Sequence, residues 1–117
     1  MTASQLRVLI VEDEPVIAMA LEDMIEDLGF ALAGTAGTLS EGLAIADTAA
    51  FDIAILDVNL NGQRSDAIAA LLAGRCVPYI FATGYGRTGV AGDAIVIEKP
   101  YSKSTLVDAI ARATASQ

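Results

Sequence analysis

Residues 8–13 read Val-Leu-Ile-Val-Glu-Asp, a short apolar run that ends on two acidic side chains. Three later runs have the same design and end on Asp57, on Thr83 and on Glu98-Lys99-Pro100. Parallel strands that neighbour one another place their carboxyl ends at one edge of the sheet. If the four runs are such strands, three carboxylates, a hydroxyl and an ammonium meet at that edge.

The segments between the runs are typical of helices. Residues 15–29, for example, have apolar side chains at helical spacing, with Pro15 in the first turn and Gly29 at the end. The runs themselves are continuously apolar, which indicates strands covered on both faces. With right-handed crossovers, this alternation predicts an α/β fold, a doubly wound parallel sheet of five strands. The predicted strands are 6–11, 30–35, 53–57, 77–82 and 94–98, and the predicted helices are 15–29, 38–50, 65–73 and one that begins after Ser102.

The segment 83–92 departs from this pattern, because four of its ten residues are glycine. Each glycine costs about 1 kcal/mol in a helix interior. We therefore expect the fourth helix to be short or missing.

Composition narrows the class of protein. The 117 residues, 54% of them hydrophobic, predict one domain over residues 1–117. The net charge of −8 disfavours nucleic acid and anionic membranes as partners, and a chain without histidine has no imidazole catalysis. The single cysteine, Cys76, excludes an internal disulfide and is expected to be a small buried side chain. No stretch resembles a signal peptide or a membrane span, so a cytoplasmic location is expected.

The cluster at the sheet edge suits phosphoryl transfer. A carboxylate such as Asp57 can attack a phosphoryl group and hold it as an acyl phosphate. The crowded acidic groups call for a divalent cation, Mg²⁺ or Mn²⁺, with Asp13 and Asp57 as direct ligands and Glu12 acting through water. The backbone carbonyl of Asn59 is a further candidate ligand. Lys99 would pair with the phosphoryl oxygens, and the hydroxyl of Thr83 would donate to them.

At this point the chain resembles the receiver domain of bacterial response regulators, from the acidic pair near residue 12 to the helix after Lys99-Pro100. The resemblance implies a flavodoxin-like sheet with strand order 2-1-3-4-5. It implies that Asp57 accepts a phosphoryl group from a sensor histidine kinase or phosphotransfer protein, with Mg²⁺. It further implies that Thr83 is the switch hydroxyl, and that the Lys99-Pro100 peptide bond is cis. Such a protein catalyses only its own phosphorylation and dephosphorylation, so it is not otherwise an enzyme.

Residues 81–86, Phe-Ala-Thr-Gly-Tyr-Gly, resemble the Phe-Ala-Thr-Gly signature of a receiver subgroup associated with general stress signalling. Ordinary receivers have an aromatic residue on strand five, where this chain has Val96. We therefore expect the glycine-rich segment that contains Gly84, Tyr85 and Gly86 to be the moving part. With strand five and the last helix, including Tyr101, it would form the partner surface.

The sequence shows no output domain after the receiver, which predicts either a stand-alone regulator or an excised receiver. A stand-alone form would act through a downstream protein partner, as a monomer or weak dimer, or as a phosphate shuttle or sink. Leu39, Leu60 and Tyr101 are expected either to lie partly exposed on the partner surface or to belong to the core.

Three rival interpretations stay open. Residues 84–89 match Gly-x-Gly-x-x-Gly, which favours a dinucleotide-binding protein, although no helix is expected to open there. A receiver-like binding module that is never phosphorylated is the second. An aspartyl-phosphate phosphatase is the third, but it would need an acid two residues after Asp57, where Asn59 stands.

Overall fold

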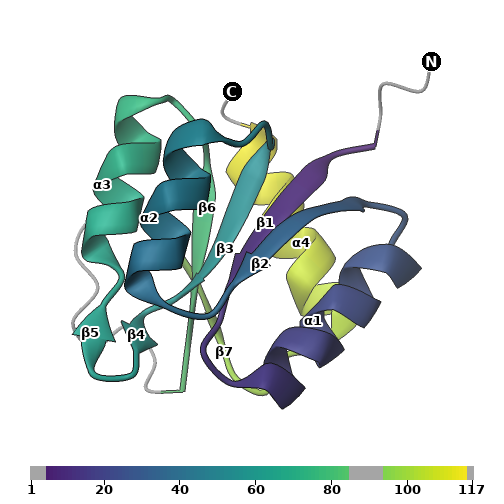
Figure 1. The fold of residues 1–117 in the computed structure, drawn as a ribbon. Coiled ribbons are helices and arrows are strands. Elements are labelled where there is room, and N and C mark those ends of the chain that lie inside the picture. Colours follow the sequence, from purple (N-terminus) through teal and green to yellow (C-terminus); the bar gives the residue numbers. More distant parts are fainter. Residues whose placement is uncertain (1–4, 85–93, 116–117) are drawn as a thin grey trace.

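The computed structural model describes residues 5–84 and 94–115. Its main elements are arranged in the order in which the sequence analysis expected them (Figure 1). Those on the amino-terminal side are β1 (Arg7–Val11), α1 (Pro15–Asp27), β2 (Ala31–Ala36), α2 (Leu39–Thr48) and β3 (Ile53–Asp57). A short hairpin of β4 (Asn59–Leu60) and β5 (Gln63–Arg64) then precedes α3 (Asp66–Gly74), β6 (Tyr79–Thr83), β7 (Ile95–Glu98) and α4 (Lys103–Ala115).

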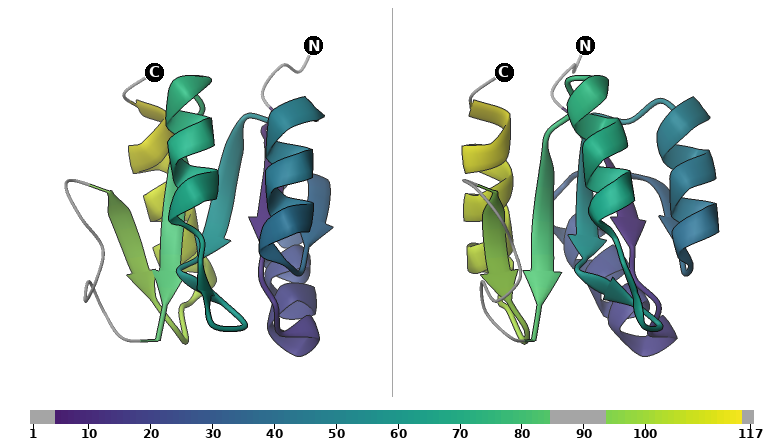
Figure 2. Two further views of the ribbon diagram at one scale, coloured as in Figure 1. Left: turned by 60° about the vertical axis from the view of Figure 1, so that its left-hand side comes forward. Right: turned by 90° about the vertical axis from the view of Figure 1, so that its left-hand side faces the viewer.

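The five long strands form one parallel sheet in the order β2-β1-β3-β6-β7. This order confirms the predicted flavodoxin-like topology. Helices α1 and α4 cover one face of the sheet, and α2 and α3 cover the other, as the turned views show (Figure 2). Within the described residues, no helix is long and apolar enough to cross a membrane.

Alternate residues of the central strands pack into two separate hydrophobic cores, one on each face of the sheet. Val8 and Ile10 of β1 pack with α1 and α4, whereas Leu9 and Val11 pack with α2 and α3. All four of these side chains are almost wholly buried. Burial on both sides explains why the strands are continuously apolar, as parallel strands between two helical layers must be.

The strand register brings the polar strand ends together. Val11 lies beside Leu56, so Glu12 and Asp57 follow at the same level of the sheet. Asp57 lies beside Ala82 on β6. Thr83, one residue further along β6, lies beside Glu98, and Lys99 comes next. Four segments that are distant in sequence thus end at one edge.

Two sequence-based expectations need correction. The β4–β5 hairpin was not expected, and it buries Leu60, which is therefore core rather than partner surface. Cys76 is exposed rather than buried, because the chain turns there with a positive φ of 61° directly after α3. The expectation of a short or missing fourth helix concerns residues 85–93, which lie outside the described residues.

Candidate functional site

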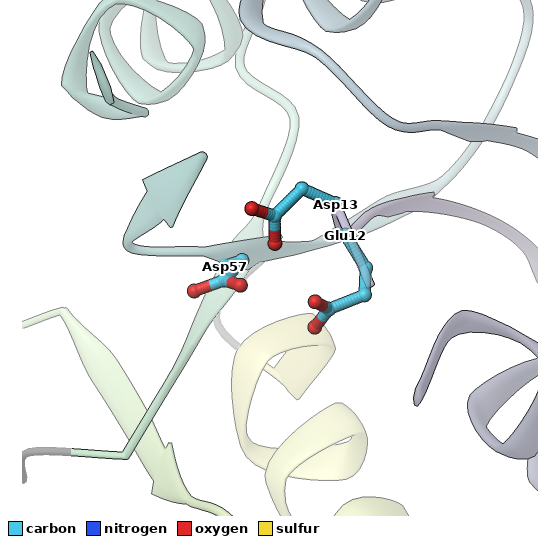
Figure 3. A group of neighbouring side chains, drawn as sticks. All are labelled: Glu12, Asp13 and Asp57. Carbon is cyan, nitrogen blue, oxygen red and sulfur yellow. The ribbon is translucent and has the colours of Figure 1, made fainter. Parts of the chain in front are cut away.

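Three carboxylates converge at the carboxyl edge of the sheet. Glu12 and Asp13 follow β1, and Asp57 ends β3. One oxygen from each lies within 4.8 Å of the others, and the three side chains surround a common space (Figure 3). Hard divalent cations prefer such a set of oxygen ligands, so the side chains present fit Mg²⁺ or Mn²⁺.

Lys99 bridges two of these carboxylates. Its Nζ donates to Oε1 of Glu12 at 2.8 Å and to Oδ2 of Asp57 at 3.0 Å. The Lys99-Pro100 bond just after β7 is cis, as the resemblance implied. Both acidic partners are largely buried, with side chains only 3% and 12% exposed. The ammonium therefore offsets negative charge inside the cluster rather than at the surface.

Burial raises the pKa of Glu12, and the charge of Asp57 adds to the rise, although the hydrogen bond from Lys99 opposes it. Desolvation thus outweighs the ion pair at this carboxylate. Burial by itself would lower the pKa of Lys99, but the hydrogen bonds to Glu12 and Asp57 overcome it and raise that pKa. Negative charge is therefore concentrated at the site beyond what one lysine compensates.

The β4–β5 hairpin holds two of the carboxylates from their other side. The backbone N–H of Asn59 donates to Oδ1 of Asp57 at 3.2 Å, and that of Asn61 donates to Oδ2 of Asp13 at 2.9 Å. Asn61 and Gly62 form the turn with positive φ angles of 53° and 86°, which Asn-Gly pairs favour. The turn thereby aims a backbone donor at the acidic cluster.

Most residues expected at the site line one pocket. Its wall includes Asp13, Asp57, Asn59, Thr83 and Lys99, together with Gly84. The hydroxyl-bearing Thr83 is 3% exposed. The N–H of Asn59 donates to Asp57, and its side-chain oxygen accepts from the N–H of Gly62. Binding of a cation by its backbone carbonyl stays a prediction.

The residues expected at the switch and partner surface are divided by the structure. Val96 packs in the core shared with α2 and α3, whereas half-buried Tyr101 packs in the core on the other face of the sheet. Gly84 lies on the pocket wall. Tyr85 and Gly86 lie outside the described residues.

Sequence reasoning missed two features around the pocket. Arg64 of the hairpin also lines it. Next to it, an apolar groove runs between α1 and the segment after β7, and it shares Ile17 and Lys99 with the pocket. Val16 and Met19 on α1 are exposed by 79% and 63%. The Asn61-Gly62 pair could have signalled the hairpin. The spacing of Ile17, Leu21 and Ile25 marks the inward face of α1, and Val16 and Met19 lie off that face, so helical spacing could have signalled their exposure.

The sequence of this chain matches a known family. Residues 8–111 match the family described as response regulator receiver domain. The chain belongs to this family. It is therefore a receiver domain of two-component signalling, as the resemblance implied.

Several relatives share this receiver domain. The phyllosphere-induced regulator PhyR of Methylorubrum extorquens is 37% identical over 113 residues, which are 91% of this chain and 42% of that protein. SdrG from Sphingomonas melonis Fr1 has a solution structure that is 41% identical with a TM-score of 0.82, covering 92% of this chain and 94% of that one. PhyR from Bartonella quintana, described as an anti-anti-sigma factor, is 27% identical with a TM-score of 0.87, covering 98% of this chain and 49% of that one. The receiver domain spans about half the length of the curated relatives it matches, between 42% and 54%.

Proposed function

We propose that this receiver domain accepts a phosphoryl group on Asp57 from the phosphohistidine of a sensor histidine kinase or phosphotransfer protein. The observation that carries the proposal is the position of Asp57 between Lys99, at 3.0 Å, and two further carboxylates. In the transfer, the phosphorus–nitrogen bond of the donor breaks, and its electron pair stays with the imidazole. A carboxylate oxygen of Asp57 forms the new phosphorus–oxygen bond.

A divalent cation, Mg²⁺ or Mn²⁺, would be held by Asp13 and Asp57, with Glu12 through water, and would offset charge on the phosphoryl oxygens. The ammonium of Lys99 binds these oxygens and gives up part of its contact with Asp57 to do so. Thr83 donates its hydroxyl to the attached group from the end of β6. These three roles position and stabilise charge, which is most of what phosphoryl transfer requires of a protein.

The groove beside the pocket suits the docking of the donor. It is lined by apolar side chains of α1 and by Pro100 and Tyr101, and it adjoins the pocket at Lys99. Val16 lines the groove, and Met19, three residues further along α1, is a second exposed apolar side chain. A donor helix that covers this surface would present its phosphohistidine next to Asp57. Burial of exposed apolar side chains would contribute to its affinity.

The output of the domain is proposed to involve the segment after β6, which follows Thr83 and contains Gly84, Tyr85 and Gly86, together with β7 and α4. Val96 occupies the position where ordinary receivers have an aromatic switch. Attachment of a phosphoryl group would then be reported by the glycine-rich segment to a downstream protein partner. NMR spectra with a phosphoryl mimic check this: shifts that spare residues 84–92 while others move would contradict it.

Intact-mass measurement after incubation with acetyl phosphate and Mg²⁺ tests the phosphorylation itself. We expect one added phosphoryl group, absent in Asp57→Ala and after chelation. Asp47→Asn, which alters an exposed acid of α2, is the matched control and keeps the gain. A wild-type domain that stays unmodified by any donor would favour the alternative, a receiver-like binding module that is never phosphorylated.

A further inference from the structure

Arg64 is a second cation at the Asp57 pocket. It lies on β5, directly opposite Asn59 of β4 in the hairpin ladder, and it lines the pocket. Asn59 in turn donates its N–H to Asp57 at 3.2 Å. The hairpin thus places a guanidinium close to the proposed phosphorylation site, from a different element than the one that supplies Lys99.

The hairpin is a firm support for this side chain. Leu60, the last residue of β4, is 1% exposed and packs in the core. Ser65 just after β5 is fully buried, and both its N–H and its hydroxyl donate to the carbonyl of Val58, at 3.0 and 3.3 Å. Anchors on both sides fix the backbone of Arg64 relative to Asp57, so only its side chain needs to move.

The negative charge of the pocket favours a second cation there. Asp13, Glu14 and Asp57 contribute negative charge to its wall, and the protein has a net charge of −8. Lys99 is already shared between Glu12 and Asp57. A phosphodonor with a doubly charged phosphoryl group therefore approaches against repulsion, which a guanidinium at the rim would reduce.

Asp66 is a partner of Arg64 that can be exchanged. Its Nε and Nη2 donate to the two carboxylate oxygens of Asp66 at 2.6 and 3.3 Å. This pair is open to water, with side chains 45% and 60% exposed, and exposed pairs hold weakly. A phosphate offers the same two-pronged acceptor geometry as a carboxylate, so the fork of the guanidinium can pass from one to the other.

We propose that Arg64 binds the phosphoryl group of the incoming donor and thereby selects doubly charged donors, with Asp66 as the competing partner. The inference rests on the proposed phosphorylation of Asp57. During transfer the bond between phosphorus and the leaving group breaks, with its electron pair going to the leaving group, and an Asp57 oxygen bonds to phosphorus. Arg64 stays protonated throughout and contacts only non-bridging oxygens.

Two small donors separate this role from a structural one. At neutral pH acetyl phosphate carries a net double negative charge, whereas phosphoramidate carries a net single negative charge because its nitrogen is protonated. We expect Arg64→Gln to slow phosphorylation by acetyl phosphate about tenfold and by phosphoramidate only about twofold, since charge-assisted hydrogen bonds favour the more negative donor. Arg64→Lys, which keeps the charge without the fork, is expected between wild type and Arg64→Gln with acetyl phosphate.

A variant of the competing partner, Asp66, is expected to raise the rate of phosphorylation. Asp66→Asn weakens the hold on Arg64 and is expected to speed phosphorylation by acetyl phosphate about twofold or more, a change that misfolding cannot mimic. Arg112→Gln removes the same charge from an exposed position on α4 and is the matched control. Both donors are used with Mg²⁺ and read by intact mass as a function of time.

Each result has one meaning. Three results would overturn the role of Arg64 while leaving Asp57 phosphorylation intact. The first is an equal loss of rate with the two donors in Arg64→Gln, and the second is a loss of rate in Arg112→Gln as large as in Arg64→Gln. The third is a rate in Asp66→Asn no higher than in wild type. A wild-type domain that neither donor phosphorylates would instead overturn the proposed function, and this inference with it.

Discussion

Lys99 donates to Glu12 across 2.8 Å, although 87 positions of sequence separate them. The contact joins the end of β7 to the end of β1, on either side of two intervening strands. Glu12 is 4% exposed, so its carboxylate depends on this ammonium and on the N–H of Glu14 for compensation. The sheet edge is therefore a preassembled site in which acidic groups exceed basic ones.

Asp13→Asn tests that excess of negative charge. The amide of the new asparagine keeps an oxygen that can accept from the Asn61 N–H. The substitution removes one of three mutually repelling carboxylates. Without divalent cations, we expect the variant to be more stable than wild type by about 1 kcal/mol, or about 4 °C in melting temperature. With Mg²⁺ the order should reverse, because only wild type gains from the cation.

Thermal unfolding followed by circular dichroism, with chelator and with Mg²⁺, measures both effects. Asp47→Asn is the control, since it removes an exposed acid outside the cluster. Equal stabilisation of Asp13→Asn and wild type by Mg²⁺ would show that the cation does not use Asp13.

The buried phenol of Tyr101 is expected to make the domain less stable at alkaline pH. Burial raises its pKa from 10.0 to about 12, with Lys99 acting in the opposite direction. A raised pKa means that the folded state keeps the phenol proton longer, so the stabilisation is complete below pH 10 and is lost as pH rises towards 12. We expect the loss to reach about 2 kcal/mol. Lys99, whose pKa is also raised, adds a loss of the same sign above its ordinary range.

Denaturant unfolding at a series of alkaline pH values measures this slope, and tyrosinate absorbance follows the phenol directly. Tyr101→Phe should flatten the slope in the window from pH 10 to 12 while leaving the part due to Lys99. A slope as steep in Tyr101→Phe as in wild type would contradict the assignment.

The long elements were predictable because each has a strong local signal. The predicted strand 53–57 coincides with β3, and Pro15 starts α1 as expected. The Thr38 hydroxyl accepts from the N–H of Glu41 at 3.1 Å, as expected of a residue that caps the start of a helix. The Glu41 carboxylate accepts from the N–H of Gly37, one residue before Thr38. The acidic cluster followed from these strands, because parallel strands in register bring their carboxyl ends together.

The remaining features depend on packing, which local patterns do not encode. Two-residue strands such as β4 and β5 are too short to show a period, so only the Asn61-Gly62 turn could have revealed them. Cys76 looked like a core residue by type, but a left-handed turn after α3 exposes it.

Gly42→Ala tests the close approach of α2 to α3. A Cβ at this position would lie 2.6 Å from Cδ1 of Ile68 and 3.3 Å from Cγ1 of Val11. Ile68 is fully buried and has little room to move. We expect overpacking to outweigh the better helix propensity of alanine and to cost about 1 kcal/mol net.

The double variant Gly42→Ala/Ile68→Val supplies the control, because valine lacks the Cδ1 that the new Cβ would meet. In a double-mutant cycle measured by denaturant unfolding, the Gly42→Ala change should be neutral or stabilising in the Ile68→Val background. The same cost in both backgrounds would rule out contact with Ile68 as its cause.

The exposed apolar side chains of α1 predict how the phosphodonor docks. Met19→Lys places a charge on the surface proposed to receive a donor helix, at a position already 63% exposed, so the fold should tolerate it. We expect transfer from a phosphorylated histidine phosphotransfer protein to slow about tenfold, the loss typical of an important interface residue. Phosphorylation by acetyl phosphate needs no protein docking and should keep its wild-type rate. Val107→Lys, at an exposed apolar residue of α4, is the matched control. Equal slowing in Val107→Lys would place the docking surface elsewhere, and slowing with acetyl phosphate would indicate damage to the pocket rather than lost docking.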